Sequence, residues 1–409
     1  MGAVDRVAKP ANPFAPSRFD DPYAFYERAR AHGPIVYQRG LRVWWVTGAE
    51  ECEAALRLTE LSSDRGELVR IVPPYDRMDP EKVDLMLSML INRDAPDHTR
   101  LRGLVNRVFT PRAMSRLEPA IRDICDELLT ELSDLESFDA VEAFCEKVPI
   151  YAIGGLLGVP PAEWERLKEI SDRLIRLIDP IIGFDPLLMN RDMDELAEMF
   201  EREFEERRRA PRDDIMTGLV EVSDGGDRLS HDELLAMCMV LLVAGYETTS
   251  SLLGNALVLF DGHRDQRAVL LEQPDLIGNA VEEILRFEPP VHSPPDRTVA
   301  QDCELHGHQL RQGQFVAPIL AAANRDPRRH EGPNEFDITR PDPRPLSFGH
   351  GAHHCLGAAL ARLEARIAIP AFLAAFPDYA VAGDGVEWKR SVTVRGPRRL
   401  VITTGVGGA

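Results

Sequence analysis

The residues best suited to redox chemistry lie in one short loop near the end of the chain. Phe348, Gly349, Cys355 and Gly357 mark this loop, which directly precedes a long apolar segment of helical periodicity. The glycines let the backbone turn tightly and approach a flat ligand, and they leave amide N–H groups free to point at the sulfur. Such donors hold the sulfur as a thiolate. The pattern therefore predicts that Cys355 is a metal-binding thiolate.

Two metals and one plain structural explanation compete at this loop. A thiolate on haem iron pushes electron density toward bound dioxygen and favours O–O cleavage more than a histidine ligand does. His353 and His354 beside Cys355 leave zinc as an alternative, and a lone buried cysteine is often only a small hydrophobe. Adjacent side chains diverge, however, and no second ligand pair stands at zinc-finger spacing. Haem is therefore the favoured metal group.

A second reactive group interrupts an apolar stretch earlier in the chain. A capping-box pattern from Ser230 to Glu233 predicts the start of a helix that continues to about residue 260. Glu247 is the single charge between residues 234 and 260, and it lies next to Thr248. Length and hydropathy alone would also fit a membrane span. Polar residues cluster at its middle, which favours a helix buried inside the protein.

The acid and the alcohol on this helix form a pair that can relay protons. Thr248 with ordered water could deliver protons to bound dioxygen, and Glu247 would connect to bulk solvent. Gly245 permits close approach of a ligand, and hydroxyls inserted in the helical ladder can bend it and open a small polar pocket. The alternative for Thr248 is a simple hydrogen bond back to a carbonyl of its own helix.

Together, the cysteine loop and the segment from Ala244 to Thr249 resemble the ligand loop and oxygen-binding helix of the cytochromes P-450. The resemblance extends from residue 22 to about 397, with the motifs in the family's order. It implies a mainly α fold with minor β, in which haem b lies between the long central helix and the helix after Cys355. No Pro/Gly/Ser-rich linker divides the chain, so we expect one domain over residues 1–409, with an arm at 1–20 and a tail at 398–409.

The resemblance also assigns positions around the cofactor. A buried haem needs cationic or hydrogen-bonding partners for its propionates. The implied haem contacts are His98, Arg102, Ala244, Gly245, Arg297, Phe348, Gly349, His353, Cys355 and Gly357, with Cys355 on the iron. Glu283, Arg286 and Arg340 match the family's Glu/Arg/Arg network, which would hold the loop beneath the haem. Without the resemblance, Glu-x-x-Arg is a weak pattern, and such pairs are usually surface contacts.

Composition limits the other classes of partner. The chain has 409 residues, is 44% hydrophobic and has a net charge of −19, which allows a large core and argues against nucleic acid or an anionic membrane. Its six cysteines show no pairing pattern, and its first residues lack a signal core. We expect a cytoplasmic protein with reduced thiols. Periodicity predicts mostly helices, with strands at 35–46, at 314–319 and near residues 392 and 401.

The reaction implied by the resemblance is monooxygenation, the hydroxylation or epoxidation of an apolar, medium-sized compound. The family places the substrate among variable segments, and we expect Ile71, Val72, Leu242, Val243, Val291, His292 and Val392 to line the pocket. Tailoring of a natural product is favoured, and a catabolic hydroxylase is the alternative. A non-catalytic haem sensor, a peroxide-using enzyme and a zinc-binding structural protein remain as competing classes.

Electrons for this reaction must come from another protein. No flavin or nicotinamide domain is recognisable in the sequence, and by family analogy the donor is an iron–sulfur ferredoxin served by an NAD(P)H-dependent reductase. Such partners are usually acidic, so we expect a basic patch on the cysteine side of the haem. Its predicted members are Arg102, Arg107, Arg112, His350, His354, Arg362 and Arg366.

Overall fold

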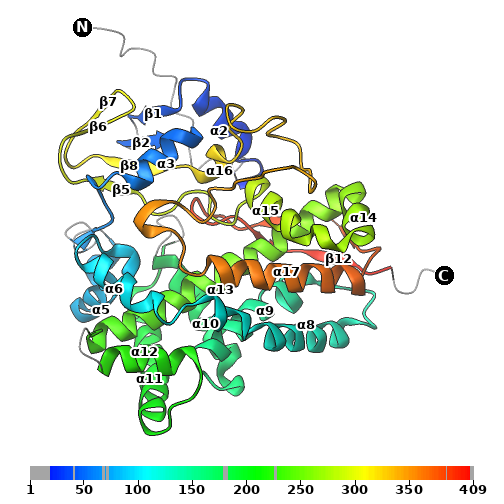
Figure 1. Ribbon diagram of the computed structural model, residues 1–409, viewed down its shortest axis with the longest axis horizontal. Helices are drawn as coiled ribbons and strands as arrows, with labels where there is room; N and C mark the ends of the chain where they lie inside the picture. The colour runs from blue at the N-terminus through cyan, green and yellow to red at the C-terminus, as the bar shows by residue number, and fades with distance from the viewer. Residues whose placement is uncertain are drawn as a thin grey trace.

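The computed structural model describes residues 19–39, 42–66, 70, 73–177, 183–224, 228–383 and 385–405, with the side chains of residues 111, 112 and 224 left aside. Helices dominate, as predicted (Figure 1). They are α2 (Tyr23–Arg30), α3 (Ala49–Arg57), α5 (Pro80–Leu87), α6 (Asp97–Asn106), α7 (Pro111–Ser115), α8 (Glu118–Leu132), α9 (Lys147–Leu156), α10 (Trp164–Leu174), α11 (Pro186–Arg209), α12 (Ile215–Asp224), α13 (His231–Gly262), α14 (Arg264–Glu272), α15 (Ile277–Phe287), α16 (Leu320–Ala323) and α17 (Ala358–Ala375).

The strands are short and form small sheets. They are β1 (Ile35–Gln38), β2 (Val43–Val46), β3 (Leu61–Ser62), β4 (Ser137–Asp139), β5 (Arg297–Val299), β6 (Cys303–Leu305), β7 (His308–Leu310), β8 (Phe315–Pro318), β9 (Ala380–Val381), β10 (Glu387–Trp388), β11 (Pro397–Arg399) and β12 (Val401–Thr403). The main sheet has the order β1-β2-β8-β5-β3, in which only β2 and β8 run parallel. The predicted class, mainly α with minor β in a single domain, is confirmed.

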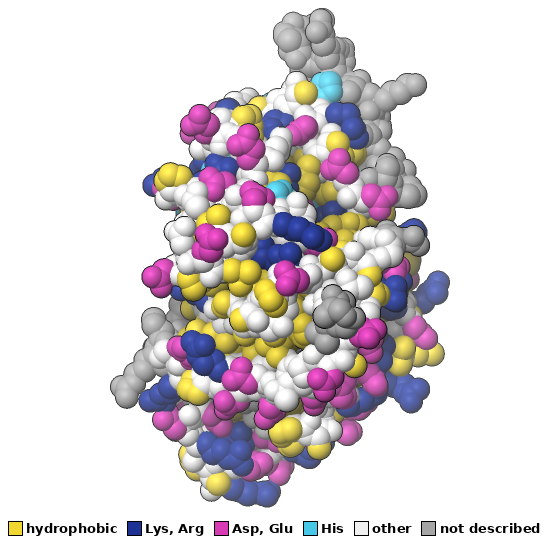
Figure 2. Space-filling model, turned by 90° about the vertical axis from the view of Figure 1, so that its right-hand side faces the viewer, with side chains coloured by type: hydrophobic (Ala, Val, Ile, Leu, Met, Phe, Trp, Pro, Cys, Tyr) yellow, Lys and Arg dark blue, Asp and Glu magenta, His cyan; other side chains and the backbone are white. Residues whose placement is uncertain are grey.

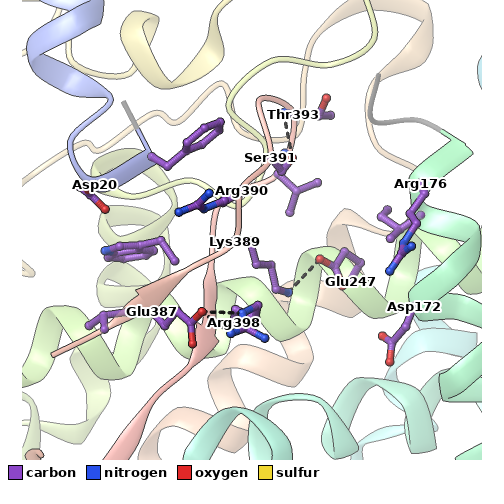
Figure 3. Close-up of a pocket in the computed structure, with 15 residues that line it drawn as sticks. Asp20, Asp172, Arg176, Glu247, Glu387, Lys389, Arg390, Ser391, Thr393 and Arg398 are labelled. Atoms are coloured by element: carbon purple, nitrogen blue, oxygen red, sulfur yellow. Dashed lines mark hydrogen bonds and ion pairs between the residues drawn. The ribbon is translucent and has the colours of Figure 1, made fainter. Parts of the chain in front are cut away.

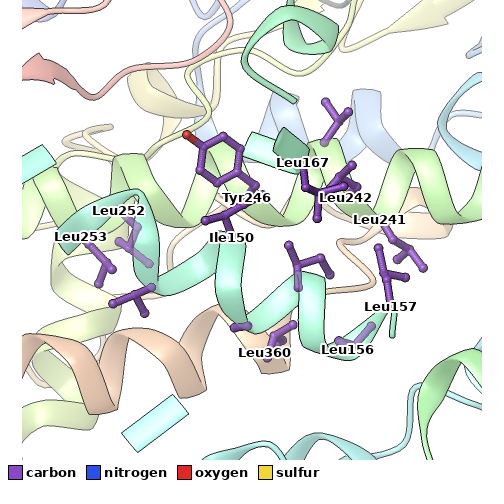
Figure 4. Packing of buried hydrophobic residues seen from close by; sticks show 14 of the residues in the cluster. Ile150, Leu156, Leu157, Leu167, Leu241, Leu242, Tyr246, Leu252, Leu253 and Leu360 are labelled. Atoms are coloured by element: carbon purple, nitrogen blue, oxygen red, sulfur yellow. The ribbon is translucent and has the colours of Figure 1, made fainter. Parts of the chain in front are cut away.

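One long helix, α13, runs through the middle of the molecule (Figure 1). It begins with the predicted capping box, because Ser230 accepts from the amide of Glu233 and the Glu233 carboxylate accepts from the amide of Ser230. Its apolar faces pack against α9, α10 and α17. Figure 4 shows leucines of α13 interleaved with Ile150 of α9 and Leu167 of α10. This central position lets one helix contribute to cavities on more than one of its faces.

The long apolar helix is a core element. Among the described residues, α13 is the one helix long and apolar enough to cross a membrane, and 72% of its most apolar window is buried inside the protein. The cost of burying Glu247 is met within the fold, because its carboxylate pairs with Lys389. All six cysteine thiols of the chain are unpaired, as the absence of a pairing pattern predicted.

The C-terminal segment differs from its prediction. We expected a tail from residue 398, but β11 pairs with β10, and β12 pairs with both β4 and β9. The strand predicted near residue 401 is β12, whereas β11 is too short to show an alternating pattern in the sequence. The predicted arm falls almost wholly outside the described residues, as do Ile71 and Val72.

The surface mixes charges of both signs in spite of the acidic balance of the chain. Figure 2 shows one face on which Asp and Glu alternate with Lys and Arg around a hollowed middle where hydrophobic side chains are visible. On this face the acidic side chains are interspersed with basic ones and do not form a single acidic surface. Local basic patches are compatible with such a surface.

Candidate functional site

The cysteine loop is held in shape by backbone hydrogen bonds. The amide of Cys355 donates to the carbonyl of Phe348 over 2.9 Å, and the amide of Gly349 donates to the carbonyl of Leu346 over 2.7 Å. Gly349 has φ of +69°, in the left-handed region that favours glycine. Gly351 also has a positive φ, and a Cβ there would lie 2.6 Å from the carbonyl oxygen of Leu56. The glycines therefore serve the tight turn that the sequence predicted.

The start of α17 points its amides at the sulfur. Gly357, the N-cap of α17, and Ala358 both donate backbone N–H groups to Cys355. Burial raises the pKa of the Cys355 thiol, whereas these amides and the nearby guanidiniums of Arg102 and Arg362 lower it. A helix N-terminus and two cations are the surroundings that favour a thiolate. The Cys355 side chain is exposed, so a ligand can reach the sulfur.

A short accessible stripe occurs on α13. Between residues 234 and 260, Ala244 is the one exposed residue, while Val240, Gly245 and Thr248 are half-buried. Residues 240, 244 and 248 lie one turn apart and therefore share a face. The Thr248 hydroxyl donates to the carbonyl of Ala244, four residues earlier in the same helix, over 2.6 Å, so the predicted alternative of a bond within the helix occurs. The hydroxyl nevertheless lies on the accessible face of the helix.

Gly245 lies against the neighbouring helix α9. A Cβ at Gly245 would lie 3.4 Å from Cδ1 of Ile153 in α9. The missing side chain therefore lets α13 and α9 pack closely. This packing function differs from the ligand approach that the sequence suggested, because the phase of a nearly uniform apolar helix cannot be read from its residues alone.

Glu247 lies on a different side of α13 from Thr248 and lines a cavity there. Its side chain is 10% exposed, and one carboxylate oxygen accepts a hydrogen bond from Lys389 Nζ at 2.8 Å. Lys389 also donates to the hydroxyl of Ser251 over 3.3 Å. Glu247, Lys389 and Asp172 line a cavity of about 590 Å³ (Figure 3). Thr248 is not among the residues that line it. The acid and the alcohol, although adjacent in sequence, have different surroundings.

A cluster of basic groups forms near the cysteine loop. The rings of His98 and His353 lie 4.0 Å apart, and His353 Nε2 is 3.0 Å from the hydroxyl of Ser63. His98 Nε2 is buried without a hydrogen-bond partner among the described residues. Burial, followed by the charge of Arg297, lowers the pKa of His353 to about 3. Arg102 and Arg297 act in the same direction on the pKa of His98, after the effect of burial.

This cluster lacks a matching anion. Burial, followed by the charge of Arg65, lowers the pKa of Arg297 to about 10. Asp94 is the one acid that acts on both histidines, and its carboxylate already accepts from Ser62 and from the amide of Ser63. Closely spaced basic groups of this kind fit a buried dianion such as the paired propionates of haem. The sequence did not single out Arg65, because a lone arginine in a loop carries no signal.

The Glu/Arg/Arg residues meet in the interior. Glu283 and Arg286, both 0% exposed, form two hydrogen bonds of 2.7 Å, and Arg340 Nε lies 3.2 Å from the same carboxylate. Arg286 also donates to the carbonyls of Asn324, Pro333 and Glu335. The amide of Asp337 donates to Glu283. The network therefore fixes α15 to the long loop that leads to Cys355.

A second buried acid, Glu364, joins α17 to the central helix. It is 2% exposed and forms a hydrogen bond with Thr249 of α13. Burial raises the pKa of Glu364 to about 8, so this carboxyl is largely protonated at neutral pH. The sequence gave no reason to select it, because an acid in a helix is usually a surface residue.

Two predicted pocket residues lie elsewhere. Leu242 is 0% exposed and packs in the main core, where Figure 4 shows it beside Leu167. His292 is 3% exposed, with Nδ1 2.9 Å from the hydroxyl of Tyr26 and Nε2 3.4 Å from Glu288. The contact with Tyr26 comes from α2 and could not be foreseen from the local sequence. His292 therefore belongs to a buried polar cluster that ties α2 to the segment after α15.

The other predicted pocket residues in the described part of the chain differ in exposure. Val291 and Val392 are half-buried, and Val291 pairs through an isolated bridge with Val394. Val243 is 9% exposed and counts among the core residues. Val291 and Val392 thus belong to the segments after α15 and before β11, which meet at this bridge.

Comparisons with known proteins agree with this geometry. The sequence profile of the family described as Cytochrome P450 matches residues 165–272 and 270–378. The chain is 37% identical to Cytochrome P450 107B1 of Saccharopolyspora erythraea over 95% of this chain and 97% of that protein. It is 38% identical to Vitamin D(3) 25-hydroxylase of Pseudonocardia autotrophica over 96% of each.

Solved structures agree as well. CalO2 superposes with a TM-score of 0.91 at 32% identity, covering 98% of this chain and 100% of that one. P450BioI, solved in complex with an acyl carrier protein that carries hexadec-9Z-enoic acid, superposes with a TM-score of 0.88 at 34% identity, covering 95% and 100%. By sequence and by structure, this chain belongs to the cytochrome P450 family and is a haem-thiolate monooxygenase.

Proposed function

We propose that Cys355 supplies the thiolate that binds the iron of haem b in this monooxygenase. The observation that carries the proposal is the pair of amides from Gly357 and Ala358 on an open sulfur, with Arg102 close enough to favour the anion. When bound, the haem supplies dioxygen binding and its reductive activation, which places one oxygen atom in the substrate and releases the other as water.

We assign the haem propionates to the basic cluster. His98, Arg102, Arg297 and His353 would hold them, because His98 Nε2 has no partner among the described residues and both arginines lie close to the paired histidine rings. Arg65 is a further candidate, since its charge acts on Arg297. The remaining contacts would be apolar or backbone contacts from Ala244, Gly245, Phe348, Gly349 and Gly357.

Thr248 and Glu247 are the residues we assign to proton handling. The Thr248 hydroxyl, on the accessible stripe of α13, would hold a water at the oxygen-binding side and pass a proton through it. Glu247 would receive protons from the charged cavity, where its carboxylate meets Lys389. Because Lys389 holds this carboxylate, the ion pair must loosen before Glu247 can serve the other side of the helix.

The proposed substrate is an apolar, medium-sized natural product, hydroxylated or epoxidised as a tailoring step. Similar proteins carry such names, including 6-deoxyerythronolide B hydroxylase of Saccharopolyspora erythraea and Polyketide biosynthesis cytochrome P450 PksS of Bacillus subtilis. Val291, Val392, Tyr75 and Phe184 are half-buried candidates for the wall, and the rings of Tyr75 and Phe184 lie 5.1 Å apart. A catabolic hydroxylase is the alternative.

The redox partner is proposed to be a ferredoxin with its NAD(P)H-dependent reductase, acting in the cytoplasm. Arg107, His354 and Arg366 are exposed and form the available part of the predicted basic patch. Arg362 contributes less, because its guanidinium already pairs with Glu282 over 2.5 Å. The side chain of Arg112 lies outside the described residues. We expect Arg107→Glu with Arg366→Glu to slow reduction by ferredoxin but not by dithionite.

The ligand assignment is tested by replacing two cysteines separately. Cys355→Ala should abolish the thiolate–haem absorption spectrum of the reconstituted protein. Cys303→Ala, which removes a half-buried thiol on β6, is the matched control and should leave that spectrum unchanged. An unchanged thiolate spectrum in Cys355→Ala would overturn the assignment.

A further inference from the structure

The charged cavity behind α13 has features that the proposed chemistry does not use. It measures about 590 Å³ and is walled by the turn after α10, by α13, by the segment before β11 and by residues 19 and 20 (Figure 3). Its volume falls in the range of small-molecule sites. The apolar part of its wall consists of Phe19, Ile175, Val386, Trp388 and Val394.

Most charges in this cavity are already engaged. Lys389 pairs with Glu247, and Arg398 pairs with Glu387. Asp172 accepts from the hydroxyl of Tyr246 over 2.8 Å and from Lys168 over 2.9 Å. Each of these three acids therefore already has a donor. Because their negative charges are paired, they repel an added anion less than free carboxylates would.

Two arginines in the cavity differ from the rest. Arg176 and Arg390 are exposed and have no hydrogen bond or ion pair to the described residues. Figure 3 shows them on two sides of the cavity, with Lys389 and Glu247 between them in this view. Asp20 is the one lining acid whose carboxylate lacks a described partner, and it partly offsets their charge.

The segments that carry Asp20 and Arg390 are held by hydrogen bonds and by ring contacts. Arg395 donates to the backbone carbonyls of Phe19 and Asp20, and its guanidinium lies 3.7 Å from the centre of the Trp388 ring. The amide of Lys389 donates to the carbonyl of Gly396 over 3.0 Å. The side of the cavity that carries Arg390 is therefore built from segments bonded to one another, and its lining combines guanidinium groups with apolar side chains.

We propose that this cavity binds an amphipathic organic monoanion, with its carboxylate held by one of the two free arginines, Arg176 or Arg390, and its hydrocarbon part against the apolar wall. Guanidinium groups present paired N–H donors that match a carboxylate. The eight charged residues of the lining carry equal numbers of positive and negative charges, so the attraction is local and arises from the two free arginines. This binding does not rest on the proposed function of the haem site.

The test compares two ligands that differ only in charge. Dodecanoate and dodecan-1-ol are titrated into the haem-loaded protein by calorimetry at low ionic strength, because salt screens exposed charges. We expect dodecanoate to bind about tenfold more tightly, a modest preference for charge-assisted hydrogen bonds at a partly exposed site. Equal affinities for the two ligands would overturn the proposal.

Variants then locate the site. Arg176→Gln with Arg390→Gln should abolish the preference, whereas Asp20→Asn should strengthen dodecanoate binding. Arg209→Gln, which removes an exposed arginine of α11 that pairs with Glu205, is the control and should keep the preference. A preference that survives the double substitution would contradict the assignment. All of the substituted side chains are exposed, so these variants are expected to fold.

The calorimetric result is separable from the proposed chemistry. The absorption spectrum of each variant reports on haem ligation, and it should be the same in all of them. A normal spectrum without a charge preference would refute the anion site alone. A charge preference in a protein that lacks thiolate–haem absorption would refute the proposed ligand and leave the anion site standing.

Discussion

Removing the carboxylate of Glu283 should cost much of the stability of the fold. In Glu283→Gln, the Arg286 guanidinium stays at 0% exposure without its anion. Breaking a buried ion pair on one side typically costs about 3–5 kcal/mol. The whole free energy of unfolding of a domain is about 5–15 kcal/mol, so this single change should expose the protein to partial unfolding.

A double-mutant cycle separates the ion pair from general damage. Glu283→Gln, Arg286→Met and the double variant are unfolded in urea with haem at fixed concentration, and the free energy of unfolding is extrapolated to water. The losses in free energy of unfolding of the two single variants should sum to about 2–3 kcal/mol more than the loss in the double variant. The reason is that the double variant buries no unpaired charge.

The matched control is a surface pair on α8. Glu118 and Arg122, at 43% and 58% side-chain exposure, contact each other at 2.7 Å. The same cycle with Glu118→Gln and Arg122→Met should give a coupling of about 0.3–0.5 kcal/mol. If the coupling free energy of Glu283 and Arg286 is as small as that of this surface pair, the buried network does not stabilise the fold in the way proposed.

Three further outcomes are expected. Thr248→Ala should lower the yield of oxygenated product per NAD(P)H consumed, while Thr248→Ser keeps it, because only a hydroxyl can hold the relaying water; equal yields in both would argue against the relay. Arg297→Leu should weaken haem binding about 10- to 100-fold in a haem-transfer assay, since a charge-assisted hydrogen bond contributes about 1.5–3 kcal/mol; unchanged affinity would remove Arg297 from the propionate site. Burial raises the pKa of Glu364 to about 8 in the folded protein, so its contribution to stability is present below the unfolded pKa near 4.5 and is lost as pH rises toward 8. Glu364→Gln should therefore gain stability relative to the parent as pH rises through this window, and parallel stability curves in urea melts would contradict the shift.

The sequence was most informative where chemistry forces residue type. The glycine-framed Cys355 loop needs left-handed backbone, which Gly349 provides, and amides directed at the sulfur, one of which Gly357 provides. The capping box at Ser230 predicted the start of α13 because its hydrogen bonds are local. The strand predictions at 35–46 and 314–319 also located β1, β2 and β8.

The sequence was least informative about which face a buried residue presents. Leu242 lies in an apolar run without a polar side, so its direction toward α10 depended on tertiary packing. His292 meets Tyr26 across 266 residues, and Glu247 meets Lys389 across 142. No local pattern records such partners. For the same reason the charged cavity, built from four separate segments, was not anticipated.

The most direct test of haem-thiolate chemistry at Cys355 is the absorption spectrum of the dithionite-reduced protein with and without carbon monoxide. Thiolate ligation predicts a strongly red-shifted Soret band in the carbon monoxide complex, and this band should disappear in Cys355→Ala. A band at the position usual for histidine-ligated haem, or no haem absorption in protein prepared with excess haem, would contradict the assignment of Cys355 and the mechanism built on it.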